Sequence, residues 1–235
     1  MSGKVLVLNP GQSQRVLGVF AKWPIPGQVK TRLAAETSEE WAARVAAAAL
    51  ADTLDRLTRI DACRRLVFAP AEAEALFTEL TRGRYALMPQ GPGDLGERLE
   101  RFIAARLEDG AEAVVVVGSD SPTLPPGLVE LAFEHLSHAD VVLGPATDGG
   151  YYLVGCRRLH PSLFSAIDWG GVCVLRQTVE RLADPSWSLV VLPPWYDVDD
   201  LQDWQMMVGH LAALRRSGID PGVPHTEALV REFMS

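Results

Sequence analysis

Short runs of β-branched and aliphatic residues alternate along the chain with longer segments in which apolar residues recur at helical spacing. The short runs predict strands at residues 16–20, 65–69, 84–88, 113–117, 141–143, 151–154 and 189–192. The longer segments predict helices at residues 37–60, 72–80, 94–103, 125–137 and 172–182, with a helical part from residue 199 onward. Strands that alternate with helices form mostly parallel sheets covered on both faces, so the pattern predicts an α/β fold.

Short polar motifs predict where some of these helices begin. In a capping box, a Ser, Thr or Asp side chain accepts a hydrogen bond from the backbone three residues on, and an acidic or amide side chain there reaches back. The chain offers three such pairs: Thr37 with Glu40, Asp94 with Glu97, and Asp199 with Gln202. We therefore expect helices to begin directly after residues 37, 94 and 199.

The run at residues 113–117 is apolar at every position, which is typical of a central parallel strand buried on both faces. Gly118-Ser119-Asp120-Ser121-Pro122 follows it directly, at an edge of the sheet that should face a ligand. Asp120 could hold Mg²⁺ through one oxygen while the ion keeps its waters and binds a polyphosphate. The alternative interpretation is that Asp120 only caps the turn that follows.

Composition limits the classes of function. The chain has 235 residues, of which 22 are Lys or Arg and 30 are Asp or Glu, and its net charge of −8 argues against a nucleic-acid or anionic-membrane binder. Residues 1–235 predict a single domain, because no linker or repeat interrupts them. The apolar run from Val5 to Leu8 is too short for a signal peptide or a membrane span, so we expect a soluble cytoplasmic protein. Three widely spaced cysteines indicate neither a zinc site nor a disulfide framework.

Three cations cluster in this acidic chain just after the first predicted strand. Lys22, Lys30 and Arg32 flank a Pro-rich stretch in which Gly27 allows close backbone approach. Lys and Arg side chains supply the charge-assisted donors that phosphate oxygens require. The segment therefore predicts a phosphate-binding loop, although a solvated basic loop is the alternative.

Two further segments carry candidate ligands. After the last predicted strand, Asp197 and Asp199 supply a second group of carboxylates, either of which could bind the same metal ion. Between two earlier strands lies Asp148-Gly149-Gly150-Tyr151, where paired glycines permit backbone contact with a ligand. Asp148 could ligate metal or bind an acceptor hydroxyl, and the residues alone leave both open.

Residues 91–96, Gly-Pro-Gly-Asp-Leu-Gly, match the GxGxxG pattern of dinucleotide-binding proteins. The match follows the third predicted strand rather than the first, and no acidic residue ends the next strand to hold a ribose. An NAD-dependent oxidoreductase is therefore a minor alternative. Gly91 and the helix start that follows could still contact a nucleotide.

Three motifs in order carry a resemblance to a known family: FAKxPxPGxVKTRL at residues 20–33, GSDSP at 118–122 and GPATDGGYYLVG at 144–155. Together they resemble a bacterial family of glycosyltransferases in the GT-A nucleotide-diphospho-sugar transferase superfamily, whose reaction is generally unassigned. The segment from Asp168 through Trp169 also looks like a family position, although Gly170-Gly171 replaces the usual Ser-Thr. More distantly, the chain is similar to 2-phospho-lactate and molybdenum-cofactor guanylyltransferases.

The resemblance implies a GT-A fold and a transfer at nucleotide phosphates that depends on Mg²⁺ or Mn²⁺. It implies that Lys22, Lys30 and Arg32 neutralise phosphate charge, that Asp120 binds metal, and that Asp197 or Asp199 is its second ligand. The family's Asp-Val-Asp-Thr-Pro-Glu-Asp-Leu reads Asp-Val-Asp-Asp-Leu-Gln-Asp-Trp here, so the choice between these two stays open. We expect Lys30 and Asp120 to carry catalysis.

The expected ligands are a nucleoside triphosphate or nucleotide sugar and a small acceptor held by residues 148–151 and Trp169. Glycosyl and nucleotidyl transfer fit this site about equally. A nucleotide-binding regulatory module without turnover is the alternative from another class.

Overall fold

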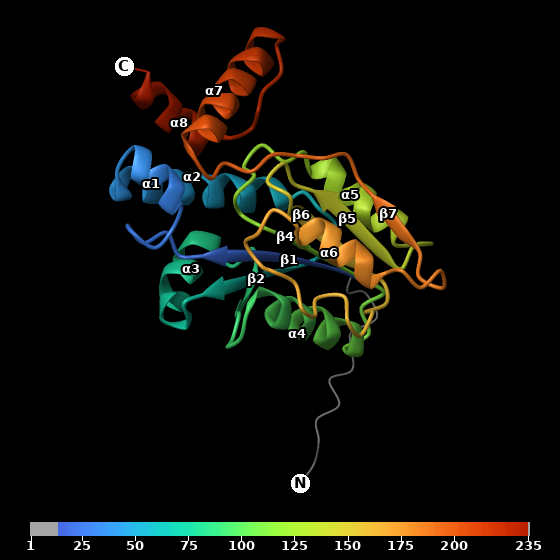
Figure 1. Cartoon of the computed structure of the whole chain (residues 1–235). Helices are drawn as coiled ribbons and strands as arrows, with labels where there is room; N and C mark the ends of the chain where they lie inside the picture. Colours follow the sequence, from blue (N-terminus) through green and yellow to red (C-terminus); the bar gives the residue numbers. More distant parts are fainter. Residues whose placement is uncertain (1–13, 235) are drawn as a thin grey trace.

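The computed structural model describes residues 14–234, so the run from Val5 to Leu8 lies outside the described residues. Seven strands form one sheet in the order β3-β2-β1-β4-β6-β5-β7, in which β6 runs antiparallel to both of its neighbours (Figure 1). The strands are β1 (Arg15–Lys22), β2 (Cys63–Ala69), β3 (Ala86–Pro89), β4 (Ala113–Val117), β5 (Val141–Pro145), β6 (Tyr151–Cys156) and β7 (Leu189–Val191). The predicted α/β class with a mostly parallel sheet is confirmed.

Helices cover both faces of the sheet, and Figure 1 shows α4 and α5 on opposite sides of the strands. One face carries α2 (Glu39–Leu57), a short 3₁₀ turn (Ala71–Ala73), α3 (Glu74–Thr81) and α5 (Pro126–His135). The other carries α4 (Leu95–Glu108) and α6 (Val174–Arg181). Within residues 14–234, no helix combines the length and the apolar character needed to cross a bilayer.

The two central strands supply both cores because successive side chains of a strand point to opposite faces. Val115 and Val117 of β4 pack on the α2 and α5 side, whereas Val114 and Val116 pack on the α4 side. All five residues of β4 are buried, as the apolar run predicts. At Gly18 of β1 a Cβ would lie 2.6 Å from the ring of Phe102, so the absence of a side chain brings α4 close to the sheet.

Two of the three predicted capping boxes are wrong by one residue. The helix expected after Thr37 is two helices, α1 (Thr31–Glu36) and α2, and the cap of α2 is Ser38, whose side chain accepts from the Trp41 amide. The hydroxyl of Thr37 instead donates to the Leu33 carbonyl at the end of α1. Asp200 rather than Asp199 caps α7 (Leu201–Arg216), in a reciprocal pair with Asp203. The predicted box of Asp94 with Glu97 is confirmed.

The helices α7 and α8 (Pro224–Phe233) stand out from the sheet beside α1 (Figure 1). They are held by a third core that joins them to α1 and α2, in which Leu33, Val198 and Trp204 are fully buried. The bidentate pair of Arg44 with Glu232 also ties α2 to α8. The helices α7 and α8, which we call the C-terminal arm, therefore hold α1 in place through Leu33.

The strand order reverses direction between β1 and β4. The chain adds β2 and β3 on one side of β1 and then crosses back to place β4 on its other side. In open α/β sheets, the helices on either side of such a reversal leave a crevice beyond the carboxyl ends of the two strands, which is where ligands bind. The segments that follow β1 and β4 are those with the candidate cations and Asp120.

Candidate active site

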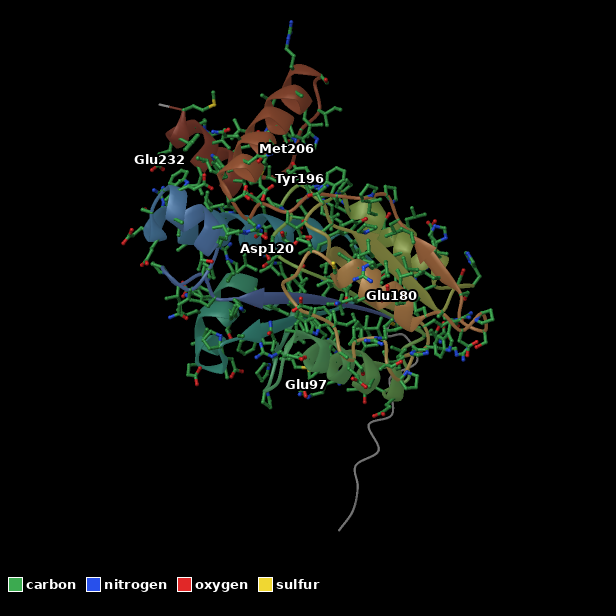
Figure 2. The ribbon with its side chains drawn as sticks, viewed as in Figure 1. Glu97, Asp120, Glu180, Tyr196, Met206 and Glu232 are labelled. Atoms are coloured by element: carbon green, nitrogen blue, oxygen red, sulfur yellow. The ribbon has the colours of Figure 1, made fainter. Side chains whose placement is uncertain are left out.

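A cleft of about 760 Å³ lies at this reversal point, within the size range of ligand sites. The side chain of Asp120, labelled near the middle of Figure 2, lies on its wall. The cleft collects candidate residues from five separate segments: Lys22, Lys30, Asp120, Asp148, Gly150, Tyr151, Trp169, Asp197 and Asp199.

Lys30 lies at the centre of this group. Its ammonium nitrogen is 2.6 Å from Asp120 Oδ1, 2.6 Å from the Val198 carbonyl oxygen and 3.4 Å from Asp199 Oδ1. The Lys30 side chain is only 2% exposed, whereas that of Asp120 is 52% exposed. Arg32 pairs with the other oxygen of Asp199 at 3.2 Å. The structure thus brings the predicted basic segment and two of the predicted carboxylates together.

Backbone hydrogen bonds hold together the three segments that carry Lys30, Asp120 and Asp199. The Val198 amide donates to the Asp120 carbonyl, and the Leu33 amide donates to the Asp199 carbonyl. Lys30 itself adopts a left-handed conformation, with φ of 45° and ψ of 49°, just before α1. This conformation is uncommon for a residue with a side chain and occurs where surrounding contacts hold it.

The charges of the cleft affect one another strongly. Burial lowers the pKa of Lys30, but the charges and hydrogen bonds of Asp120 and Asp199 outweigh it, so that pKa lies above its ordinary value. Burial raises the pKa of Asp197 to about 7, against a hydrogen bond from the Ser121 hydroxyl. Repulsion from Asp120, Asp148 and Asp199 adds to the increase. Asp197 is therefore a carboxyl group that titrates near neutrality.

The residues present fit a divalent ion bound together with a phosphate ligand. Among residues 14–234, no three His, Cys, Asp or Glu side chains come together as a complete metal site. Three oxygens nevertheless surround the Lys30 ammonium nitrogen at 2.6 to 3.4 Å. They belong to Asp120, Asp199 and the Val198 carbonyl. Mg²⁺ typically binds through one or two carboxylates and completes its shell with waters and substrate phosphates. Asp197 lines the same cleft but directs one oxygen to Ser121.

A third cation on the cleft wall, beside Lys22 and Lys30, was not predicted from the sequence. The guanidinium of Arg98, on α4, donates to Gln90 Oε1 at 2.9 Å. The buried Gln90 amide nitrogen donates in turn to the carbonyls of Ala21 and Val67 on β1 and β2. This network fixes the orientation of the Gln90 amide and places Arg98 beside the cleft.

The candidate acceptor residues line the cleft at the start of β6 and, through Trp169, beside Gly96 at the start of α4. Asp148 accepts a hydrogen bond from the Gly150 amide, and the rings of Tyr151 and Trp169 pack edge to face. Gly149 lies outside the lining, because it packs against the next loop, where a Cβ would lie 2.1 Å from the Val172 carbonyl oxygen. Gly149 therefore joins two loops instead of facing a ligand.

Three other predicted residues also lie outside the lining of the cleft. Gly27 has a φ of 75° and packs on the Glu39 carboxylate, and Gly91 has a φ of 76° and packs on Arg101. Arg32 reaches the cleft only through Asp199 and is 61% exposed. The two glycines thus shape turns, and Arg32 remains accessible to a large ligand.

A family profile described as an uncharacterized protein conserved in bacteria (DUF2064) matches residues 32–171, more than half of the chain. The chain belongs to this family. A comparison of this DUF2064 member with curated proteins found no match.

Several solved structures similar to this DUF2064 chain are described as transferases. A protein of Desulfovibrio desulfuricans G20, described as a nucleotide-diphospho-sugar transferase, is 33% identical over 94% of this chain and 99% of its own, with a TM-score of 0.83. A cytidylyltransferase of Leptospira borgpetersenii is 10% identical over 94% and 95% of the two chains, with a TM-score of 0.58. The 4-diphosphocytidyl-2C-methyl-D-erythritol synthase of Anaerococcus prevotii is 12% identical over 85% and 97%, also with a TM-score of 0.58. The last two share the fold, which is GT-A-like as the resemblance implied.

Proposed function

We propose that this protein is a glycosyltransferase that takes a nucleotide-diphospho-sugar donor with Mg²⁺ or Mn²⁺ and transfers the sugar to a small acceptor. The observation that carries the proposal is the meeting of Lys30, Asp120 and Asp199 in one cleft at the reversal of strand order. The similarity to the Desulfovibrio desulfuricans protein that is described as a nucleotide-diphospho-sugar transferase supports the choice of donor. We further propose that the described residues act as one catalytic domain.

The residues divide into two groups along the cleft. Asp120 and Asp199 would hold the divalent ion, which when bound neutralises the diphosphate and stabilises the charge on the departing nucleoside diphosphate. Lys22 and Lys30 donate to phosphate oxygens, and Arg98 supplies a third cation on the same side. Such fixed charges stabilise a leaving phosphate without a covalent intermediate. Asp148, Tyr151 and Trp169 hold the acceptor near the sugar.

The balance of charge favours a sugar donor over a nucleoside triphosphate. Three cations line the cleft, Lys22, Lys30 and Arg98, against five carboxylates, which are Asp94, Asp120, Asp148, Asp197 and Asp199. A nucleotide diphosphate diester carries less negative charge than a triphosphate with a phosphorylated acceptor, and like charges repel more strongly in a partly desolvated cleft. Nucleotidyl transfer remains the second candidate, supported by the fold that the chain shares with cytidylyltransferases.

A thermal-shift screen tests donor binding. The screen covers nucleotide sugars and nucleoside triphosphates, each with and without Mg²⁺ or Mn²⁺. We expect at least one donor to raise the melting temperature only when metal is present, because a ligand that binds the native state stabilises that state. Asp120→Asn should abolish the metal-dependent part of that shift. Asp148→Asn should retain it, since Asp148 lies on the acceptor side.

Product analysis then separates the reactions. Release of a nucleoside diphosphate supports glycosyl transfer, and release of pyrophosphate supports nucleotidyl transfer. Donor binding without either product, across an acceptor panel of sugars, polyols and their phosphates, would favour a regulatory module. If no nucleotide or nucleotide sugar shifts the melting temperature, the proposed function is wrong.

A further inference from the structure

The ammonium of Lys30 lies inside a cage of oxygens. Asp120 Oδ1, Asp199 Oδ1 and the Val198 carbonyl surround it at 2.6 to 3.4 Å, and a lysine ammonium has three N–H donors to give. The side chain is 2% exposed, so water hardly reaches it. These three oxygens therefore already surround a cation that belongs to the chain itself.

The same oxygens are those that the proposed function assigns to the divalent ion. Mg²⁺ and Mn²⁺ bind carboxylate and carbonyl oxygens at close to 2 Å. A divalent ion between Asp120 and Asp199 would lie within a few ångströms of the Lys30 nitrogen, where two positive charges repel each other. The ion and the ammonium therefore exclude one another from this position.

Phosphate oxygens offer Lys30 an alternative partner. Lys30 and Lys22 both line the cleft, so a diphosphate between them would accept hydrogen bonds from both side chains. Four rotatable bonds let a lysine move its charge over several ångströms without a backbone change. Asp120 and Asp199 would then lose their internal counterion as the nucleotide arrives.

We propose that Lys30 occupies the metal position until nucleotide binds, so that the protein takes the metal–nucleotide complex as one ligand and does not bind the metal first. This inference rests on the proposed function, which supplies the nucleotide and the ion. It assigns Lys30 a positioning role in addition to phosphate binding. Before nucleotide arrives, the Lys30 side chain blocks metal binding and balances the negative charge of Asp120 and Asp199.

Titration with Mn²⁺ alone tests the inference without any nucleotide. Isothermal titration calorimetry or the electron paramagnetic resonance signal of free Mn²⁺ gives the dissociation constant for wild type and Lys30→Met. Lys30→Met keeps an unbranched apolar stem and removes the charge, so it should bind Mn²⁺ at least ten-fold more tightly than wild type. Lys22→Met, which removes a cation of the same cleft outside the cage, should change the Mn²⁺ affinity much less than Lys30→Met does.

A double variant locates the new site. Adding Asp120→Asn to Lys30→Met should abolish the gain, because one of the two carboxylate ligands is lost. Lys30→Gln replaces Lys30→Met if circular dichroism shows that the latter fails to fold. The inference would be overturned if wild type and the folded Lys30 variant bind Mn²⁺ with equal affinity. It would also be overturned if wild type binds Mn²⁺ tightly in the absence of nucleotide. A nucleotide screen without any hit would refute the proposed function instead, and the two failures are therefore distinguishable.

Discussion

Asp197→Asn should change how the stability of this protein depends on pH. The carboxyl of Asp197 has a pKa of about 7 in the folded protein, against 3.8 without the protein environment, mainly because it is buried. Protonation is therefore easier in the folded state than in the unfolded one. The stability that Asp197 contributes is fully present below pH 3.8 and is lost as the pH rises through 7.

The size of this effect follows from the two pKa values. Each unit of difference corresponds to about 1.4 kcal/mol, so the complete loss amounts to roughly 4 kcal/mol. Between pH 5 and pH 8 the loss is about 2 to 3 kcal/mol, because part of it has already occurred below pH 5. Asparagine has no proton to lose, and the variant should therefore gain this amount relative to wild type over the same range.

Urea unfolding followed by tryptophan fluorescence at pH 5, 6.5 and 8 measures the difference. The buffers contain EDTA, because a divalent ion in the cleft would change the charge around Asp197. Asp168→Asn, at an exposed carboxyl near the rim of the cleft, is the control for removing a carboxylate from this region. A difference between Asp197→Asn and wild type that does not vary with pH would show that burial does not perturb this carboxyl as argued.

Three other substitutions test a contact between loops, the packing of the C-terminal arm and the role of Arg98 in donor binding. In urea titrations, Gly149→Ala should lower the free energy of unfolding by about 1 to 3 kcal/mol more than Gly170→Ala does. Both glycines have positive φ, but only Gly149 lies against a neighbouring backbone. Equal losses would refute that contact. Trp204→Ala should lower the free energy of unfolding by about 3 to 5 kcal/mol, because this side chain of α7 is fully buried in the core that α7 and α8 share with α2. A smaller loss would mean that the C-terminal arm packs loosely. Arg98→Met should weaken the donor-dependent rise in melting temperature while Arg101→Met, on the outer side of Gln90, leaves it unchanged. Equal weakening would remove Arg98 from the donor site.

The elements that the sequence predicts well are those with a long or strict pattern. The buried run of β4 and the capping box at Asp94 lie where the pattern places them. The short helix α1 was missed because its six residues follow a Pro- and Gly-rich stretch, and its N-cap has no side-chain hydrogen bond to signal it. Without α1, the first capping pair was assigned to Thr37 instead of Ser38.

The candidate site was predictable in part for a similar reason. Lys30, Asp120 and Asp199 each follow a strand, and strand ends meet at one edge of a parallel sheet, so their convergence could be expected from local patterns. The pairing of Gln90 with Arg98 depends on carbonyls of two other strands, and no local pattern records it. The same holds for the contact of Gly149 with Val172, which joins loops that the sequence keeps apart.

The third core has a consequence for how the protein is made. Leu33, which secures the segment after Lys30, is covered by residues from Tyr196 to Leu229, and two partners of the Lys30 ammonium, Val198 and Asp199, belong to the same late stretch. During synthesis, a ribosome-bound chain carries Lys30 and Asp120 long before it carries those partners. The full set of oxygens around the Lys30 ammonium therefore assembles only once residues 196–229 have emerged, and shorter translation products should lack the contacts of Lys30 with Val198 and Asp199.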